Sequence, residues 1–392
     1  MFALALLLAG PAHAQVVNAT LCFEYDVNYS DTDIAALSDD YITSDIPHQP
    51  ARDAVVHIEN DTLTWLGDIV VTLNSSGCAT VGLQAVWRYT LKLRAEGTTD
   101  GVDWEVVGPG GGVYVNFAAT NWQPVASPPT FTTGVHPAWN IVSTIRHSLE
   151  RINVPSAAYT FHDSGCPGST GAASCERSPD IWIDPSHDDN KYIIAHELGH
   201  AVMESCNNER DENLDGGGTG GNCTSAARGN LAKKEYQSNA ANEGAAWYYS
   251  ALTFNRRTDN DCQIARCLDH NATGFCTTTE LYPSCEGLVS EPWSNLDYLG
   301  SHCTGTLTGR AVRFDYVRAF WDLTQDAPNG SGQGLIFPDV CDLWLEARPD
   351  TWDANGGGSS GNDPETRLRD AADALGFLTE WDNVDNANGI HR

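Results

Sequence analysis

The chain has 392 residues, enough to bury a sizeable core and more than one small domain usually contains. Its 52 acidic and 22 basic residues give a formal net charge of -30, so binding to nucleic acid or to an anionic membrane surface is electrostatically unfavourable. We therefore expect a protein without nucleic-acid or membrane partners, and we expect it to be a monomer.

Residues 1–14 have the pattern of a secretory signal peptide. An apolar run at residues 2–8 is followed by Ala-His-Ala at residues 12–14, a small-x-small cleavage pattern. The run is too short to span a bilayer, and no other segment approaches the ~20 apolar residues that a spanning helix needs. We expect a soluble mature chain that is secreted to the extracellular space or the periplasm.

Twelve cysteines, an even number, suit an oxidising compartment and up to six disulfides. No CxxC pair occurs, which favours structural disulfides over a thiolate zinc site. Two pairs lie close in sequence, Cys166 with Cys175 and Cys206 with Cys223, but spacing alone does not define the connectivity.

Residues 15–125 alternate apolar and polar positions between turn signals, as in AVVHIEN and DIVVTLN. Within a longer alternating segment, Asp100-Gly101 has the composition of a hairpin turn. The pattern predicts an antiparallel β-sandwich domain. A proline-rich junction at residues 123–130 marks its end.

Residues 126–392 change in character and predict a second domain of the α+β class. Apolar residues in AWNIVSTIRHSLERI recur at helical spacing, and two short strands follow in AAYTFHD and DIWIDPS. Further helices are expected around residues 237–253 and 309–324, and the remainder should be a loop-rich tail containing DANGGGSSGND.

The segment KYIIAHELGH, residues 191–200, predicts a metal site. His196 and His200 are four residues apart and so lie on one face of a helix, from which two imidazoles can reach one ion. Apolar residues lie on the opposite face, and Asp188, Asp189 or Asn190 can cap the helix. Glu197 lies beside His196, where it can accept a proton from a water molecule at the metal.

A catalytic zinc site needs a third protein ligand. The three-histidine motif HExxHxxGxxH is absent, because Met203 and Cys206 occupy the positions of its glycine and last histidine. A glutamate on a second helix is the other common solution, and Glu243 lies among small residues that allow two helices to approach closely. Its competitors lie in less favourable settings; they are Glu204, Glu209 and Glu235.

These motifs resemble those of the gluzincins, the metallopeptidase group that includes thermolysin and the fungalysins. HELGH matches the family's HExxH, and NEGAAWYYSA resembles its second helix. The resemblance covers about residues 190–325 and implies a zincin-type domain with Zn²⁺ held by His196, His200 and Glu243. Thermolysin-like enzymes usually place an aspartate four residues after the glutamate to orient a zinc-binding histidine, but Trp247 is found here.

The same resemblance implies peptide-bond hydrolysis with Glu197 as the base. GSHCTGTLTGRAVRFDYVRAFWDL resembles a fungalysin segment, which makes His302 the candidate that stabilises the oxyanion. A structural histidine beside Cys303 is the alternative for that residue. Four tyrosines are alternative donors; they are Tyr248, Tyr249, Tyr298 and Tyr316.

A second metal site is a weaker prediction. Asp211, Asn213 and Asp215 follow the first half of an EF-hand loop, but Asn222 stands where a bidentate carboxylate is needed. We favour an acidic loop bridged by Cys206 and Cys223 over a Ca²⁺ site.

The leading hypothesis is a secreted zinc peptidase acting on peptides or proteins. One alternative is a secreted binding or adhesion protein on a zincin scaffold without turnover, although the presence of Glu197 argues against it. Another is a zinc amidase that cleaves short or non-peptide substrates. Neither the cleavage preference nor the role of the sandwich follows from the sequence.

Overall fold

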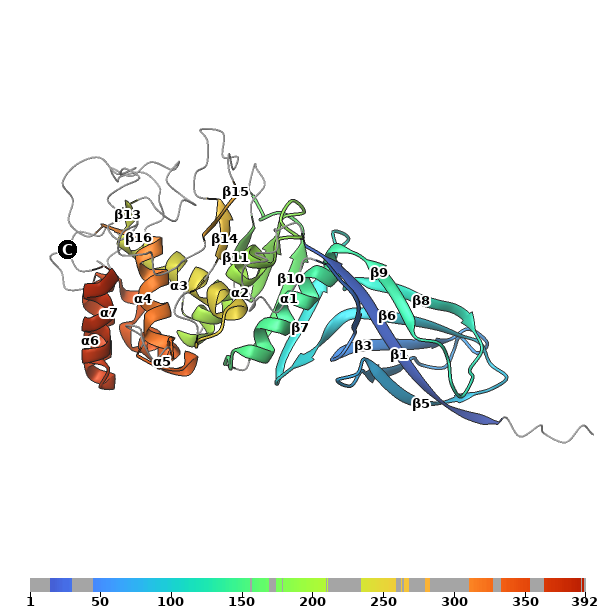
Figure 1. Cartoon of the computed structure of the whole chain (residues 1–392). Coiled ribbons are helices and arrows are strands. Elements are labelled where there is room, and N and C mark those ends of the chain that lie inside the picture. Colours follow the sequence, from blue (N-terminus) through green and yellow to red (C-terminus); the bar gives the residue numbers. More distant parts are fainter. Residues whose placement is uncertain are drawn as a thin grey trace, which may run out of the picture.

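The computed structural model describes residues 15–29, 45–155, 157–168, 174–177, 179–208, 210, 234–258, 262, 264–267, 279–282, 310–326, 333–352, 363–388 and 390. These residues form a mixed α/β structure with seven α-helices and open sheets of mixed direction. The larger sheets lie at one end of an elongated molecule and most helices at the other, with α1 between them (Figure 1). The expected signal peptide, residues 1–14, lies outside the described residues.

One sheet has four strands and is built around the long strand β1 (Val16–Asn28). Alternate β1 residues, Leu21, Phe23 and Tyr25 among them, are fully buried, as the period of two requires. β1 pairs with three strands; they are β2 (Asp45–Pro50) and β5 (Cys78–Gln84), both antiparallel, and β9 (Phe131–Val135), parallel.

The second sheet has eight strands in the order β11-β12-β10-β7-β6-β3-β4, with β8 also paired to β6. β6 and β7 form the expected hairpin, in which Asp100 and Gly101 have φ values of 49° and 85°. The strands are β3 (Ala54–Asn60), β4 (Ile69–Thr72), β6 (Tyr89–Thr99), β7 (Val102–Val107), β8 (Val115–Trp122), β10 (Ala158–Asp163), β11 (Cys175–Arg177) and β12 (Asp180–Ile183).

This sheet continues across the expected domain boundary at residues 125 and 126. β7, from the first segment, pairs in parallel with β10, from the second, and β10 pairs in parallel with β12. Hydrophobic residues of both sheets belong to one core with those of the helices. The pairings establish open mixed sheets, while the β-sandwich and the zincin-type domain stay predictions.

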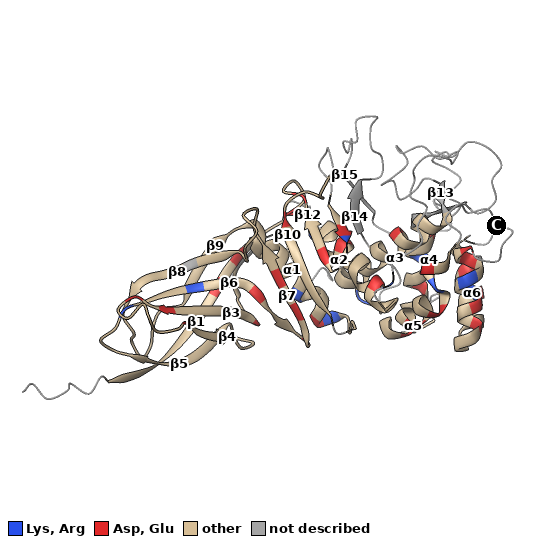
Figure 2. Cartoon of the chain, turned by 180° about the vertical axis from the view of Figure 1, so that it is seen from behind, with Lys and Arg blue, Asp and Glu red and all other residues tan. Residues whose placement is uncertain are grey.

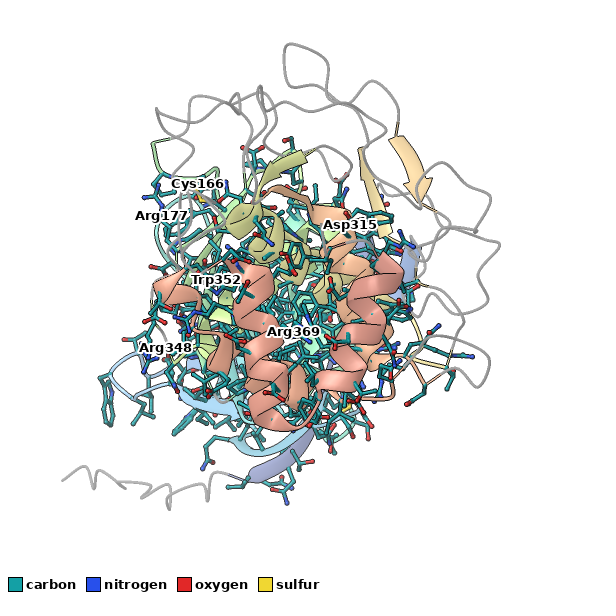
Figure 3. All side chains as sticks on the ribbon, turned by 90° about the vertical axis from the view of Figure 1, so that its left-hand side faces the viewer. Cys166, Arg177, Asp315, Arg348, Trp352 and Arg369 are labelled. Atoms are coloured by element: carbon teal, nitrogen blue, oxygen red, sulfur yellow. A yellow bond between two sulfur atoms is a disulfide. The ribbon has the colours of Figure 1, made fainter. Side chains whose placement is uncertain are left out.

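The expected loop-rich tail is wrong, because three helices occupy much of it. Asp363 caps α6 by accepting a hydrogen bond from the Thr366 backbone N–H. Arg369 of α6, labelled in Figure 3, binds Asp382 of α7 through two nitrogens. The helices are α1 (Pro137–Arg151), α2 (Lys191–Cys206), α3 (Gln237–Phe254), α4 (Arg313–Thr324), α5 (Phe337–Ala347), α6 (Pro364–Leu375) and α7 (Leu378–Asn388). Two small two-stranded sheets are also present; they pair β13 (Lys234–Tyr236) with β16 (Arg310–Val312), and β14 (Ile264–Cys267) with β15 (Thr279–Tyr282).

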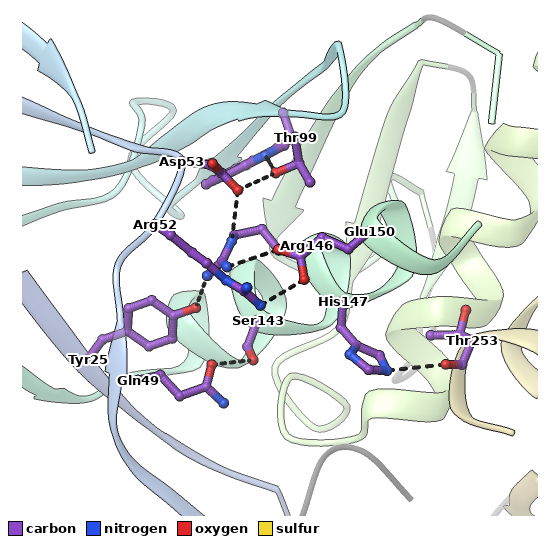
Figure 4. A network of polar contacts seen from close by, with 11 residues as sticks. Tyr25, Gln49, Arg52, Asp53, Thr99, Ser143, Arg146, His147, Glu150 and Thr253 are labelled. Atoms are coloured by element: carbon purple, nitrogen blue, oxygen red, sulfur yellow. Dashed lines mark hydrogen bonds and ion pairs between the residues drawn. The ribbon is translucent and has the colours of Figure 1, made fainter. Parts of the chain in front are cut away.

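Helix α1 connects the sheets to the helical end through polar contacts on two sides (Figure 4). The buried guanidinium of Arg146 donates to the Tyr25 hydroxyl at 2.8 Å and lies 3.6 Å from the Asp53 carboxylate. His147 contacts the Thr253 carbonyl oxygen of α3 at 3.2 Å. Burial lowers the pKa of His147 to about 3, so the imidazole is neutral.

Three disulfides join described cysteines, as expected for an oxidising compartment; they are Cys22–Cys78, Cys166–Cys175 and Cys206–Cys341. The suggested Cys206–Cys223 bridge is wrong, because Cys206 at the end of α2 pairs with a cysteine of α5 that is distant in sequence. Asp and Glu outnumber Lys and Arg at both ends of the molecule (Figure 2). Among the described helices, none has the length and apolar character needed to cross a membrane.

Candidate metal centre

Helix α2 begins as the sequence predicts. Asn190 is the N-cap, and its side chain accepts a hydrogen bond from the Ile193 backbone N–H at 3.0 Å. Ile194, Leu198 and Val202 are fully buried and form the apolar stripe of the helix. His196 and His200 therefore project from another face, toward α3.

Helix α3 packs directly against α2. Alanines line much of its buried surface, and Ser250 donates a hydrogen bond to the Tyr192 carbonyl oxygen of α2 at 3.0 Å. Gly199 of α2 faces Ala246 of α3 without an intervening side chain. The close approach allows the short side chain of a glutamate on α3 to reach the histidines of α2.

The two helices bring the three predicted ligands together. One ligand atom each from His196, His200 and Glu243 lies within 4.8 Å of the others, and no other such group occurs among the described residues. His196 Nε2 is 3.5 Å from a Glu243 carboxylate oxygen, and the two imidazole centroids are 4.6 Å apart. Two nitrogens and one carboxylate oxygen form a donor set that suits a transition-metal ion.

The base candidate Glu197 follows His196 directly on α2. Its exposed fraction is 7%, beside 5% for His196, so both side chains are largely shielded from bulk water. Glu197 is thus a buried carboxylate on the same helix as the two histidines.

Trp247 occupies the position one helical turn after Glu243. Its indole stacks on the His196 imidazole with centroids 4.2 Å apart and an interplanar angle of 24°. The second helix thus gives the His196 ring an aromatic contact.

The expected oxyanion-stabilising residue His302 and its alternative Tyr298 lie outside the described residues, as do the calcium candidates Asp211, Asn213 and Asp215. The other three tyrosines are fully buried in the helical core, and burial raises the pKa of each; they are Tyr248, Tyr249 and Tyr316. Tyr249 packs against Phe337 of α5. The three hydroxyls are therefore poor candidates for contact with a substrate.

Sequence reasoning missed a group of carboxylates beside the start of α2. Asp163 ends β10, Asp184 follows β12, and Asp188 and Asp189 precede the cap of α2. Burial and repulsion from the other three carboxylates raise the pKa of Asp188 to about 6. An aspartate at the carboxyl end of each of two adjacent parallel strands was the available signal, since such ends meet at one sheet edge.

Comparison with models of known protein families and with curated proteins finds no match to this chain. The candidate site therefore rests on its own geometry: a cluster of His196, His200 and Glu243 that can hold a metal ion.

Proposed function

We propose that the chain is a secreted zinc peptidase whose metal is held by His196, His200 and Glu243. The observation that carries the proposal is the convergence of these residues from two helices onto one point, although Glu243 follows His200 by 43 positions. Two neutral imidazoles and one carboxylate leave a coordination position for water and substrate. Glu197, next to this group, is the proposed base.

A bound zinc ion would supply Lewis acidity and make water acidic enough to lose a proton near neutral pH. Glu197 would accept the proton of the attacking water and then deliver it to the departing amine. Glu243 contributes one negative charge to the ligand set and so offsets part of the charge of the ion. His302 remains our candidate for stabilising the oxyanion.

The neighbouring sheet edge supports a peptide as substrate. β11 is the last strand at this end of the described sheet, runs antiparallel to β12 and packs beside α2. An outermost strand offers backbone N–H and C=O groups to which an extended peptide can add as a further strand. Three disulfides also support export to an oxidising compartment.

The test is casein cleavage by the mature chain after its zinc content has been measured, with Glu197→Gln as the matched variant. We expect the wild type to cleave casein, and the variant to bind zinc but lose at least 100-fold in rate, the usual range for a lost proton-transfer group. If the zinc-loaded wild type leaves casein and a mixed peptide library intact, the peptidase proposal is wrong. A binding scaffold, or an amidase with a narrow substrate, would then explain the site.

A further inference from the structure

Gly199 lies between the two histidines of the metal centre, at the contact between α2 and α3. A Cβ atom placed on it would lie 2.7 Å from the Ala246 carbonyl oxygen and 3.0 Å from both the Ala246 Cα and the Tyr249 Cβ. Two of these three atoms belong to the backbone of α3, so no side-chain rotation relieves the overlap. Any side chain at residue 199 must push the helices apart or tilt them.

The position of this contact links it to the metal ligands. On α2, Gly199 directly precedes His200 and follows His196 by three residues; on α3, Ala246 follows Glu243 by three residues. Residues three apart share a helix face, so the contact and the ligands lie on the same facing surfaces. A displacement of α3 at Ala246 is therefore transmitted to Glu243.

We propose that Gly199 is a positioning residue: its missing side chain sets the helix spacing that brings Glu243 to His196 and His200. The inference rests on the metal centre of the proposed function and not on peptide hydrolysis. Zinc binding to the full mature chain tests it without any activity measurement.

Helix propensity and close packing predict opposite effects of Gly199→Ala. Alanine is the better helix former, so without the close contact the substitution would raise the unfolding temperature of the metal-free protein. With the contact, it lowers this temperature and raises the Kd for zinc at least tenfold. An unchanged zinc Kd in a folded variant would overturn the inference.

A double-mutant cycle separates positioning from general destabilisation. Glu243→Gln removes the ligand that Gly199 is proposed to place, so adding Gly199→Ala to it should raise the zinc Kd by less than threefold. If the zinc Kd of the double variant rises by the product of the two single-variant fold-changes, Gly199 does not act through Glu243 and the inference fails.

The destabilising control is Gly77→Ala, because a Cβ on Gly77 would lie 2.7 Å from the Phe23 carbonyl oxygen of β1 and the φ of 70° at Gly77 disfavours alanine. This variant should lose stability yet keep the wild-type zinc Kd when measured below its unfolding transition. If its Kd rises as much as that of Gly199→Ala, the effect reflects stability alone and the inference is wrong.

Glu243→Asp gives a second test that holds even if Gly199→Ala does not fold. The Glu243 side chain is partly exposed, and aspartate keeps the charge while shortening the reach by one methylene. If α2 and α3 cannot move closer together to compensate for the shorter side chain, the zinc Kd rises at least tenfold, as in Glu243→Gln. An aspartate variant that binds zinc like the wild type would overturn the inference, whereas a wild type that binds no zinc would overturn the proposed function itself.

Discussion

Trp247 stacks on His196 with ring centroids 4.2 Å apart, and both rings lie in the contact between α2 and α3. A flat contact of this kind restricts rotation of the imidazole about its side-chain torsions, because the indole covers one face. The His196 ring is therefore held in place before any metal arrives.

Replacing Trp247 should weaken zinc binding through His196. Loss of an outer contact to a metal ligand typically costs 10–100-fold in affinity, so we expect Trp247→Leu to raise the zinc Kd about tenfold. Trp247→Phe, which retains a ring, should recover most of this loss. Trp321→Phe is the control, because Trp321 is equally buried on α4; equal Kd values in all three variants would contradict the role.

His147 should make the protein acid-sensitive. Its pKa is about 3 in the folded chain against an ordinary value of 6.5, so the unfolded chain binds a proton that the folded one does not. The contribution of neutral His147 to the free energy of unfolding is complete above pH 6.5 and is lost as the pH falls toward 3. At pH 5 the loss is about 2 kcal/mol. The test is urea unfolding of the metal-free protein. Because the side chain of His147→Gln can still donate a hydrogen bond to Thr253, this variant should lose less unfolding free energy than the wild type between pH 7 and 5. If both proteins lose the same amount, His147 is not the cause of the acid sensitivity.

Asp188 should have the opposite pH dependence. Its folded pKa of about 6 lies above the ordinary 3.8, so its folded form binds the proton more tightly and stability falls as the pH rises from 4 to 6. Asp188→Asn should therefore raise the unfolding temperature more at pH 7 than at pH 4. A variant less stable than the wild type at pH 7 would mean that its carboxylate is stabilising.

Arg146 should contribute more to the free energy of unfolding than its exposed neighbour Arg52. Arg146→Met leaves Asp53 and Glu150 without their buried cation, and we expect a loss of about 3 kcal/mol in the free energy of unfolding. Arg52 also binds Glu150, at 2.7 Å, but is 42% exposed, so Arg52→Met should cost less than ~1 kcal/mol. If chemical denaturation shows comparable losses of unfolding free energy in the two variants, the buried position of Arg146 does not explain its contribution.

The Cys206–Cys341 disulfide should stabilise the helical end more than the short Cys166–Cys175 loop stabilises its own segment. Sequence separations of 135 and 9 correspond to about 5 and about 3 kcal/mol in the chain-entropy model. Replacing each pair with alanines and comparing unfolding temperatures tests the order. A smaller effect from the Cys206–Cys341 pair would show that the model does not apply here.

Local chemistry made several features predictable from the sequence. The Asn190 cap, the four-residue histidine spacing and the small residues around Glu243 each act over a few positions, and the structure brings these ligands together. The α6 helix was also predictable, because Asp363-Pro364 is a strong helix start. The glycine-rich segment before it suggested loops for the whole tail, so this helix was not predicted.

Other features depend on contacts between distant segments. Cys206 had a near neighbour in sequence, yet its partner is on α5, and spacing carries no information about that choice. The stacking of Trp247 on His196 depends on how two helices pack. The parallel pairing of β7 with β10 likewise crosses the proline-rich junction, which composition alone had suggested as a division.

The continuity of the sheet has a consequence for proteolytic processing. A protease that nicked the chain at residues 123–130 would cut one peptide bond but leave the β7–β10 pairing, the β1–β9 pairing and the Arg146 contacts intact. The two fragments would stay associated and migrate as one species until denatured. Processing in this segment would therefore not release the helical end as a separate fragment.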